Sequence, residues 1–171
     1  AYNVEVMKSD LGKPWGIVNL PDGRFLITEK SGFMNILSAD GQTMSKVEGF
    51  PAVDSKAQGG LLDVALDPDF KNNRMIYWTF SEPVAGGNHT AVGKGKLSGD
   101  EKTIENPQVI VRASPTYDGK LHYGSRLVFD KDGDLFVSTG ERSDLETRPL
   151  ALNTMAYLDT VLKMTKDGKT A

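Results

Sequence analysis

The sequence predicts an all-β fold, a β-propeller of four-stranded blades. Short apolar runs of strand length recur along the chain, separated by turns rich in glycine, aspartate and proline. A pattern of apolar run, Asp-Gly turn and apolar run occurs at 16–28 and again at 126–138, 110 residues later, with a longer-turn version at 61–79. Because these runs are apolar on both strand faces, they fit stacked sheets covered front and back, as propeller blades are.

Three such units correspond to about three blades. Propellers close with about four to eight blades, so three blades cannot close a ring alone. Either residues 1–171 are one partial propeller domain within a larger ring, or copies associate to cover the open sheets. The alternative is a β-sandwich with coincidental turns, which is less favoured because sandwich strands usually leave one face polar.

The first predicted strands follow from apolar runs between glycine-bearing turns. Tyr2–Met7 alternates apolar and polar residues and is predicted as the first strand. Turns at 21–24 and 30–32 each carry a glycine where the backbone needs a positive φ. They delimit the predicted strands Trp15–Leu20, Phe25–Glu29 and Phe33–Leu37. A further turn is predicted at 38–42 and a proline-containing loop at 49–56.

The strands in the rest of the chain are bounded in the same way. Further strands are predicted at Leu61–Leu66, Met75–Phe80, Thr90–Leu97, Val109–Ala113, Arg126–Phe129, Leu135–Thr139 and Val161–Met164. His89 follows Gly86-Gly87 and is predicted to lie in a loop. The one predicted helix covers Leu150–Leu162, whose apolar residues have partial helical spacing.

A hairpin within 121–142 brings together a histidine and a carboxylate. Two strands flank the turn at 130–133, and if Phe129 pairs with Asp134, counting outward places His122 opposite Glu141. Facing residues on antiparallel strands have Cβ atoms about 4.5–5.5 Å apart. That is the geometry of a base held by an orienting acid. A surface ion pair at a strand end has the same spacing, and spacing alone favours that interpretation.

Composition excludes several classes of function. The formal net charge is −3 with both signs interspersed, so no basic surface indicates nucleic acid as a partner. The chain has no cysteine, which excludes disulfides, thiolate zinc sites and thiol catalysis, and its two histidines are far apart, so no metal ligands are assigned. No apolar run approaches the 18 or so residues of a membrane span, and no membrane insertion is predicted. A start without Met or a signal-like segment indicates a processed or trimmed chain.

Five motifs occur in the order of a known family between about Val4 and Lys169. They are Lys13-Pro14-Trp15-Gly16, Leu20-Pro21-Asp22-Gly23-Arg24, the run 58–66 (QGGLLDVAL), Pro68-Asp69-Phe70 and the run 122–129 (HYGSRLVF). The sequence resembles the soluble aldose (glucose/sorbosone) dehydrogenases that use pyrroloquinoline quinone. The resemblance implies the N-terminal half of a six-bladed propeller, with calcium and the quinone in a cleft at one end. It also implies a periplasmic or secreted bacterial oxidoreductase that oxidises the anomeric carbon of an aldose sugar.

The resemblance also implies roles for four residues. His122 falls on the family's catalytic base and Glu141 on an acidic residue that orients it. Gln58 falls on a cofactor-binding glutamine, although by itself it is more typical of a turn before a Gly-Gly bend. Arg126 lies within a motif and is assigned to cofactor binding, but the sequence does not decide between ligand contact and pairing with a neighbouring carboxylate.

The chain also departs from the family pattern. The family's calcium ligands and further cofactor-binding residues are expected outside this chain, in a C-terminal half or a second copy. Residues 152–160 lack the family's usual Gln-Asp-Leu run, and Leu121 stands where one branch has an aspartate. Two rival hypotheses therefore stay open. One is a non-catalytic half-propeller that associates with itself or a partner, and the other is a metal-dependent propeller hydrolase such as a lactonase.

Overall fold

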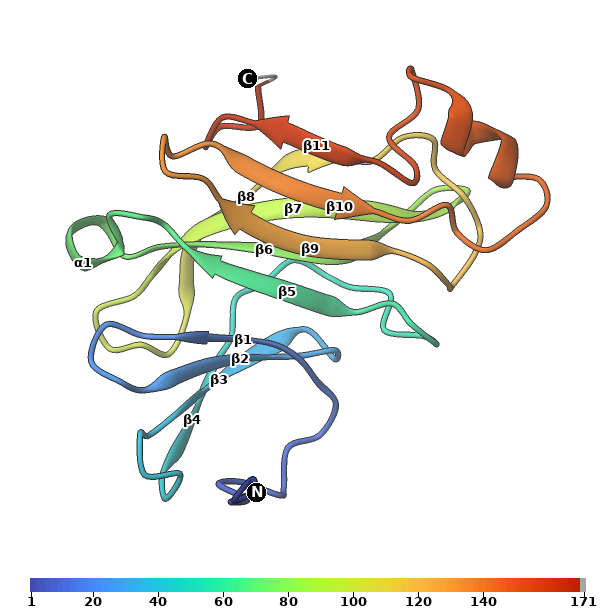
Figure 1. Cartoon of the computed structure of the whole chain (residues 1–171). Helices are drawn as coiled ribbons and strands as arrows, with labels where there is room; N and C mark the ends of the chain where they lie inside the picture. The colour runs from blue at the N-terminus through green and yellow to red at the C-terminus, as the bar shows by residue number, and fades with distance from the viewer. Residues whose placement is uncertain (170–171) are drawn as a thin grey trace.

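The computed structural model describes residues 1–169 and contains three antiparallel sheets (Figure 1). The first sheet runs β1 (Pro14–Asn19), β2 (Phe25–Glu29), β3 (Phe33–Leu37) and β4 (Met44–Val47). The second runs β5 (Leu61–Leu66), β6 (Met75–Val84), β7 (Gly87–Leu97) and β8 (Ile104–Arg112). The third has three strands within the described residues, β9 (Gly124–Phe129), β10 (Leu135–Thr139) and β11 (Val161–Met164). The all-β prediction is confirmed.

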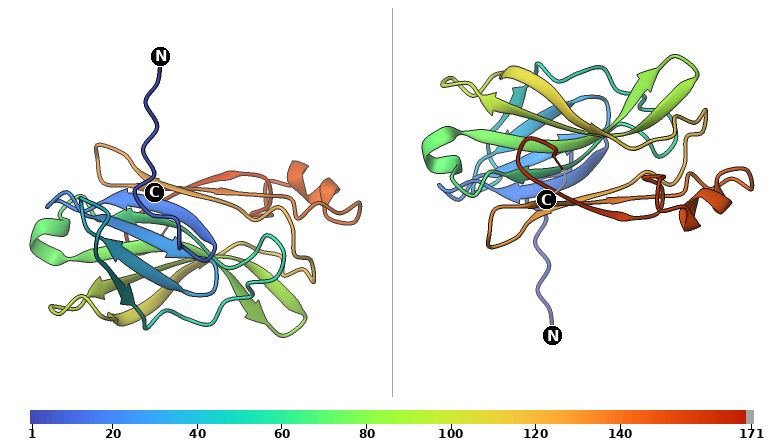
Figure 2. Two further views of the ribbon diagram at one scale, coloured as in Figure 1. Left: turned by 90° about the horizontal axis from the view of Figure 1, so that it is seen from below. Right: turned by 90° about the horizontal axis from the view of Figure 1, so that it is seen from above.

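The three sheets are stacked in chain order. Strands β1, β5 and β9, each the first of its sheet, contact one another in succession, and the later strands of each sheet fan outward (Figures 1 and 2). Within the described residues, helical structure is limited to α1 (Phe70–Asn73) and the 3₁₀ helix η1 (Arg148–Leu152). No helix within residues 1–169 is long and apolar enough to cross a membrane.

Two apolar cores hold the stack together, one on each face of the second sheet. Trp78 on β6 is fully buried between the first two sheets, edge to face with Phe50 at a ring-centroid distance of 5.0 Å. Its neighbour Tyr77 points the opposite way, as successive strand residues do, and packs on Phe129 of the third sheet, also at 5.0 Å. Burying about 150–250 Å² on each aromatic ring contributes roughly 4–6 kcal/mol.

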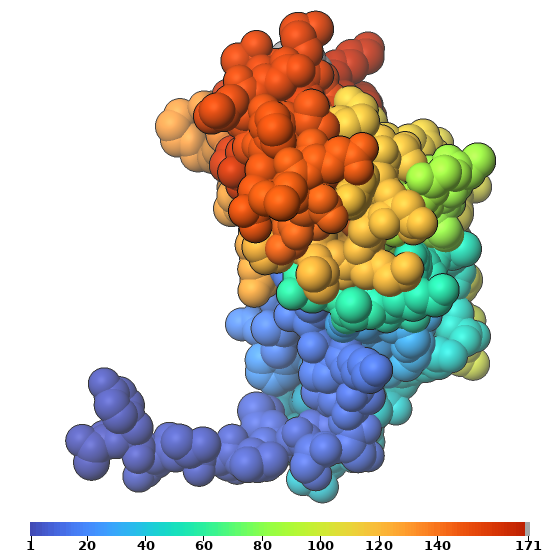
Figure 3. Space-filling model, turned by 90° about the vertical axis from the view of Figure 1, so that its right-hand side faces the viewer, coloured from blue at the N-terminus to red at the C-terminus, as the bar shows by residue number. Residues whose placement is uncertain are grey.

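Two predicted elements are wrong. Tyr2–Met7 is not a strand: its side chains are largely exposed and it pairs with no sheet, because alternation without a surface to bury against does not hold a strand. Figure 3 shows this segment projecting from the body of the protein. The predicted helix Leu150–Leu162 is instead η1 followed by turns and β11. None of the η1 residues is buried, and the apolar residues that do pack inward, Leu158 and Leu162, lie beyond η1 in a bend and in β11.

Other boundaries differ in detail. β4 was not expected, and β8 begins at Ile104 rather than Val109. His89 lies in β7 rather than in a loop, buried beside Glu82 with Nε2 and Oε2 2.7 Å apart. The remaining predicted strands are present within a few residues of their predicted bounds.

The hairpin β9–β10 has a different register from the one predicted. Phe129 pairs with Leu135, not with Asp134, because the turn closes by a bond from Asp130 N to Asp134 O with Gly133 in the left-handed region. A bulge opposite Ser138 then shifts the pairing by one residue, so that Thr139 faces Gly124. Continuing from that pair places His122 opposite Glu141, as predicted, although by a route that the count did not contain.

Candidate active site

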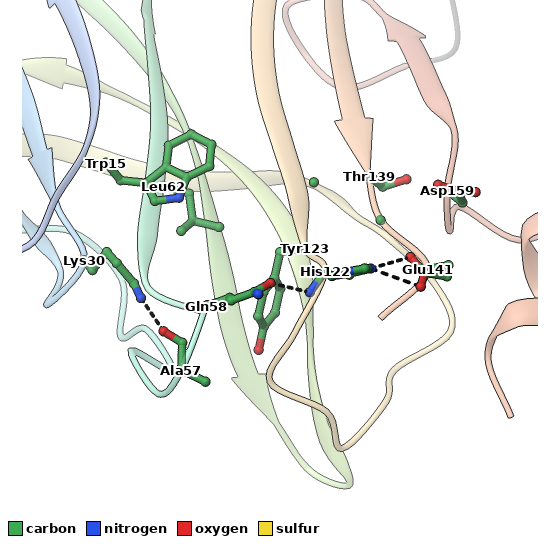
Figure 4. A pocket seen from close by; sticks show the side chains of 12 residues that line it. Trp15, Lys30, Ala57, Gln58, Leu62, His122, Tyr123, Thr139, Glu141 and Asp159 are labelled. Atoms are coloured by element: carbon green, nitrogen blue, oxygen red, sulfur yellow. Dashed lines mark hydrogen bonds and ion pairs between the residues drawn. The ribbon is translucent and has the colours of Figure 1, made fainter. Parts of the chain in front are cut away.

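A cleft of about 530 Å³ lies at the end of the stack where β5 and β9 begin and β10 ends (Figure 4). Segments from all three sheets contribute to it, and the cleft opens to solvent. Its lining residues are Trp15, Lys30, Ala57, Gln58, Leu62, His122, Tyr123, Gly124, Thr139, Gly140, Glu141 and Asp159.

The predicted contact between His122 and Glu141 is present in this cleft. Nδ1 of His122 lies 2.9 and 3.0 Å from the two carboxylate oxygens of Glu141. The hydrogen bond from His122 holds the pKa of the Glu141 carboxyl below its ordinary value. An ionised carboxylate only accepts, so Nδ1 carries the proton and donates it, which leaves the lone pair of Nε2 free to accept another. The half-exposed ring therefore has the geometry that a base with an orienting acid would have.

Gln58 contacts the backbone of the same histidine. The side-chain oxygen of Gln58 accepts a hydrogen bond of 2.8 Å from the His122 backbone N–H. The orientation of the amide follows, because the donor is an N–H and the acceptor must be the oxygen. The amide NH₂ of Gln58 is therefore presented to the cleft as a donor, and the residue joins the loop before β5 to the loop before β9.

Close backbone packing brings the two sides of the histidine–carboxylate pair together. A Cβ on Gly140 would lie 2.3 Å from the carbonyl oxygen of His122, and one on Gly124, at φ +69°, would lie 2.5 Å from the carbonyl carbon of Thr139. Only glycine permits this approach. His122 itself has φ +45°, a left-handed conformation that costs on the order of 1 kcal/mol outside glycine and directs its ring away from regular strand geometry.

Beneath the histidine lies a buried polar network that the sequence analysis did not find. Arg142, 2% exposed, donates to the carbonyl of Gly119 at 2.5 Å and to Oδ1 of Asn88 at 2.6 Å. The hydroxyl of Tyr123 lies 3.1 and 3.0 Å from the same two oxygens and can donate its one proton to either of them. The only signal in the sequence was that Arg142 follows Glu141, and it does not reveal a partner 54 residues away.

Arg126 lies outside the cleft. Its guanidinium stacks on the ring of Trp15 at 4.4 Å and pairs with Asp63 at 3.3 Å, with 68% of the side chain exposed. It lines an adjoining groove along β1, β5 and β9. Arg126 contacts Trp15, which lines the cleft, but is not itself among the lining residues, and its assignment to cofactor binding stays a prediction.

Lys30 supplies a positive charge that the sequence analysis did not single out. Its ammonium group donates to the carbonyl of Ala57 and lies on the cleft wall opposite the hairpin (Figure 4). Asp159, at φ +54°, lines the far side. Nothing in the sequence distinguished these two residues from other turn and strand-end charges, because their position depends on how the sheets stack.

The polar groups of the cleft suit a planar ligand that carries several oxygen atoms. The ammonium of Lys30 and the amide of Gln58 line it as donors, Nε2 of His122 lines it as an acceptor, and the carboxylates of Glu141 and Asp159 also line it. The indole ring of Trp15 supplies a flat apolar wall. These groups fit carboxylate and carbonyl oxygens such as those of a quinone cofactor. Within residues 1–169, no three His, Cys, Asp or Glu side chains gather as a group that could hold a metal ion.

Comparisons with known proteins agree on one family. The sequence matches the family described as Glucose / Sorbosone dehydrogenase over residues 11–171. Aldose sugar dehydrogenase YliI of Escherichia coli (strain K12) is 36% identical over 169 residues, covering 98% of this chain and 45% of that protein. The chain thus spans about half the length of the curated relatives it matches.

Solved structures share the fold. A crystal structure of glucose dehydrogenase matches with a TM-score of 0.92 at 36% identity, covering 98% of this chain and 48% of that one. The PQQ-bound form of an aldose sugar dehydrogenase from Streptomyces coelicolor matches with a TM-score of 0.84 at 26% identity, covering 98% and 49%. These matches confirm the predicted propeller fold for the three sheets.

Proposed function

The chain belongs to the glucose/sorbosone dehydrogenase family, and from that premise we propose that it is the N-terminal half of an oxidoreductase that oxidises the anomeric carbon of aldoses with pyrroloquinoline quinone. The observation that carries the proposal is the His122–Glu141 pair at the wall of an open cleft, with Nδ1 2.9 Å from the carboxylate. Bound in the cleft, the quinone supplies a two-electron acceptor for the hydride that leaves the sugar.

In this proposal the chain's own residues handle the proton. Nε2 of His122 accepts the proton of the anomeric hydroxyl, and Glu141 stabilises the imidazolium that forms. General-base assistance of this kind typically contributes about 10²–10⁴-fold in rate. Gln58 holds the backbone of His122, so the direction of the ring is set before substrate arrives.

The same cleft offers contacts for the cofactor. The NH₂ of Gln58 and the ammonium of Lys30 would donate to its oxygen atoms, and Trp15 would lie against its rings. Arg126 would act from behind Trp15, through the stacked pair. Calcium would be held by residues outside the described chain.

The proposed enzyme needs further blades. Val128 and Val161 are 60% and 64% exposed on the outer face of the third sheet, where a propeller packs its next blade. We assign that face to a C-terminal half or to a second copy of the chain. The proposed location is the periplasm or the outside of a bacterial cell.

The test is a titration of the purified chain with pyrroloquinoline quinone and calcium. Quinone absorbance reports binding, and the fluorescence of Trp15 reports it independently, since the other tryptophan, Trp78, is buried in the core. We expect saturable binding that weakens at least fivefold in His122→Ala and Gln58→Ala. Gln108→Ala, at an exposed position of β8, is the matched control and should bind like the parent chain.

The outcomes separate the proposal from its rivals. Binding followed by aldose-dependent reduction of a dye supports the oxidoreductase. Self-association without any quinone binding would overturn the claim that this chain carries a working half-site, and would favour the non-catalytic half-propeller. Metal-dependent hydrolysis of a lactone without quinone would favour the hydrolase.

A further inference from the structure

Arg142 is a buried cation with no carboxylate among its hydrogen-bond partners in the described structure. Four of its five N–H donors are used, by the carbonyls of Gly119, Leu121 and Asn88 and by the side-chain oxygen of Asn88, at 2.5 to 3.4 Å. Its guanidinium also lies over the ring of Tyr123 at 4.1 Å. Burial lowers the pKa of Arg142, because desolvation disfavours its charged form.

Such an arrangement is costly for a purely structural role. Removing a guanidinium from water carries a large desolvation penalty. Neutral carbonyl acceptors offset less of this penalty than a carboxylate would, because they carry no full negative charge. Loops are ordinarily held by backbone amides or small polar side chains, at far lower desolvation cost. Here the planar fork reaches three separate segments at once: the strand carrying Asn88, the loop at Gly119 and the residue before His122.

The position of Arg142 in the chain connects it to the histidine. Glu141 and Arg142 are consecutive residues just after β10: Glu141 bonds the ring of His122 in the cleft, while the buried Arg142 bonds the carbonyl of Leu121. The backbone N–H of Arg142 also donates to the carbonyl of His122 at 3.3 Å. Glu141 and Arg142 therefore fix both the ring of His122 and the backbone carbonyls of Leu121 and His122.

We propose that Arg142 is a positioning residue for the proposed base: by holding Leu121 and Gly119, it fixes the backbone of His122 so that its Nδ1 meets Glu141. The inference rests on the proposed function for its catalytic meaning. The claim that Arg142 holds His122 against Glu141 does not depend on the quinone. The positioning role and the proposed function can therefore fail independently of each other.

The readout is the pKa of the Glu141 carboxyl, which depends on contact with His122. It is measured by NMR on protein with ¹³C-labelled glutamate, and the signal is assigned by its loss in Glu141→Gln. Arg142→Lys keeps the positive charge but loses the fork, and Arg142→Met loses both. The other charges facing Glu141 across the cleft, Lys30 and Asp159, are unchanged in both variants.

We expect the Glu141 pKa to rise toward its ordinary value in both Arg142 variants, because the hydrogen bond from His122 that lowers it is weakened. A rise only in Arg142→Met would show that charge alone matters and would overturn the proposal, as would no rise in either. Arg112→Lys is the matched control, because that arginine pairs with Glu82 beside the other histidine. It should leave the Glu141 signal unmoved.

A folding check keeps the test decisive. The indole N–H signal of Trp78, in the core between the first two sheets, must be retained in each variant. If both Arg142 variants lose it, Tyr123→Phe takes their place, since it removes the hydroxyl that bridges Gly119 and Asn88 but keeps the ring. A smaller rise of the Glu141 pKa in Tyr123→Phe supports the proposal, and an unchanged value overturns it.

Discussion

Replacing Gly140 by alanine should open the hairpin at the histidine–carboxylate pair. The added Cβ would lie 2.3 Å from the carbonyl oxygen of His122 and 2.7 Å from its carbonyl carbon, both backbone atoms that cannot rotate away. Ordinary contact begins near 3.4 Å, so the two strands must separate by about 1.1 Å. Carried to the side chains, that movement stretches the 2.9 Å bond between His122 and Glu141 beyond hydrogen-bonding distance.

The loss of stability in Gly140→Ala can be estimated from the cost of overpacking. Forcing extra atoms into a close-packed site typically costs about 1–3 kcal/mol, which lowers the melting temperature of a domain of this size by about 2–12 °C. Thermal unfolding followed by circular dichroism measures the loss, and the Glu141 pKa measures the opened pair.

Gly99 provides the matched control for this substitution. A Cβ there would meet nothing within 4 Å, and Gly99→Ala should leave the melting temperature unchanged within about 1 °C. If Gly140→Ala melts with the parent chain and keeps the lowered Glu141 pKa, the argument that close backbone approach sets this contact is refuted.

Three further predictions test the electrostatics and the open faces. His122→Gln removes the histidine hydrogen bond that lowers the Glu141 pKa. A carboxyl whose pKa is lowered on folding stabilises the protein at pH values above its unfolded pKa, and this stabilisation is lost as the pH falls through its folded pKa. The variant should therefore melt below the parent at pH 6, and the difference should shrink as the pH falls from 4.5 through the lowered folded pKa of Glu141. A difference that does not shrink with falling pH contradicts the assignment. Lys30→Met should weaken quinone binding about fivefold to tenfold, since one partly screened charge contributes about 1 kcal/mol, whereas Lys131→Met at the hairpin tip should not. The parent chain should show concentration-dependent mass by sedimentation, and Val128→Asp should reduce it; a monomer at all concentrations would refute association through this face.

The sequence was sufficient for the parts of the fold that depend on local pattern. Strands such as Val161–Met164 are bounded by turn residues and alternate in burial, so composition and spacing fix them. It was insufficient where a pattern lacked a packing surface. Tyr2–Met7 alternates as well as any strand, yet its side chains are largely exposed. Leu150–Leu162 has partial helical spacing, yet its inward-packing residues Leu158 and Leu162 lie outside η1, whose own residues are not buried.

In the candidate site too, contacts within one hairpin could be predicted from the sequence, whereas contacts between sheets could not. His122 and Glu141 lie on one hairpin, so counting along it could bring them together, and the turn and the bulge shift the register in opposite senses and leave the pair intact. Lys30 and Asn88 come from other sheets, and no local count reaches them.

The bulge also has a physical reason that only the assembled fold reveals. Ser125 is fully buried at φ +92°, and Thr79 of the neighbouring sheet donates to its carbonyl at 2.8 Å. Next to it, the N–H of Leu127 donates to the Asp63 carboxylate at 2.9 Å. These two contacts join the irregular part of β9 to the second sheet, in addition to its contacts with β10. The register at His122 is therefore set by packing between blades, and a hairpin excised from this stack should not reproduce the histidine–carboxylate contact.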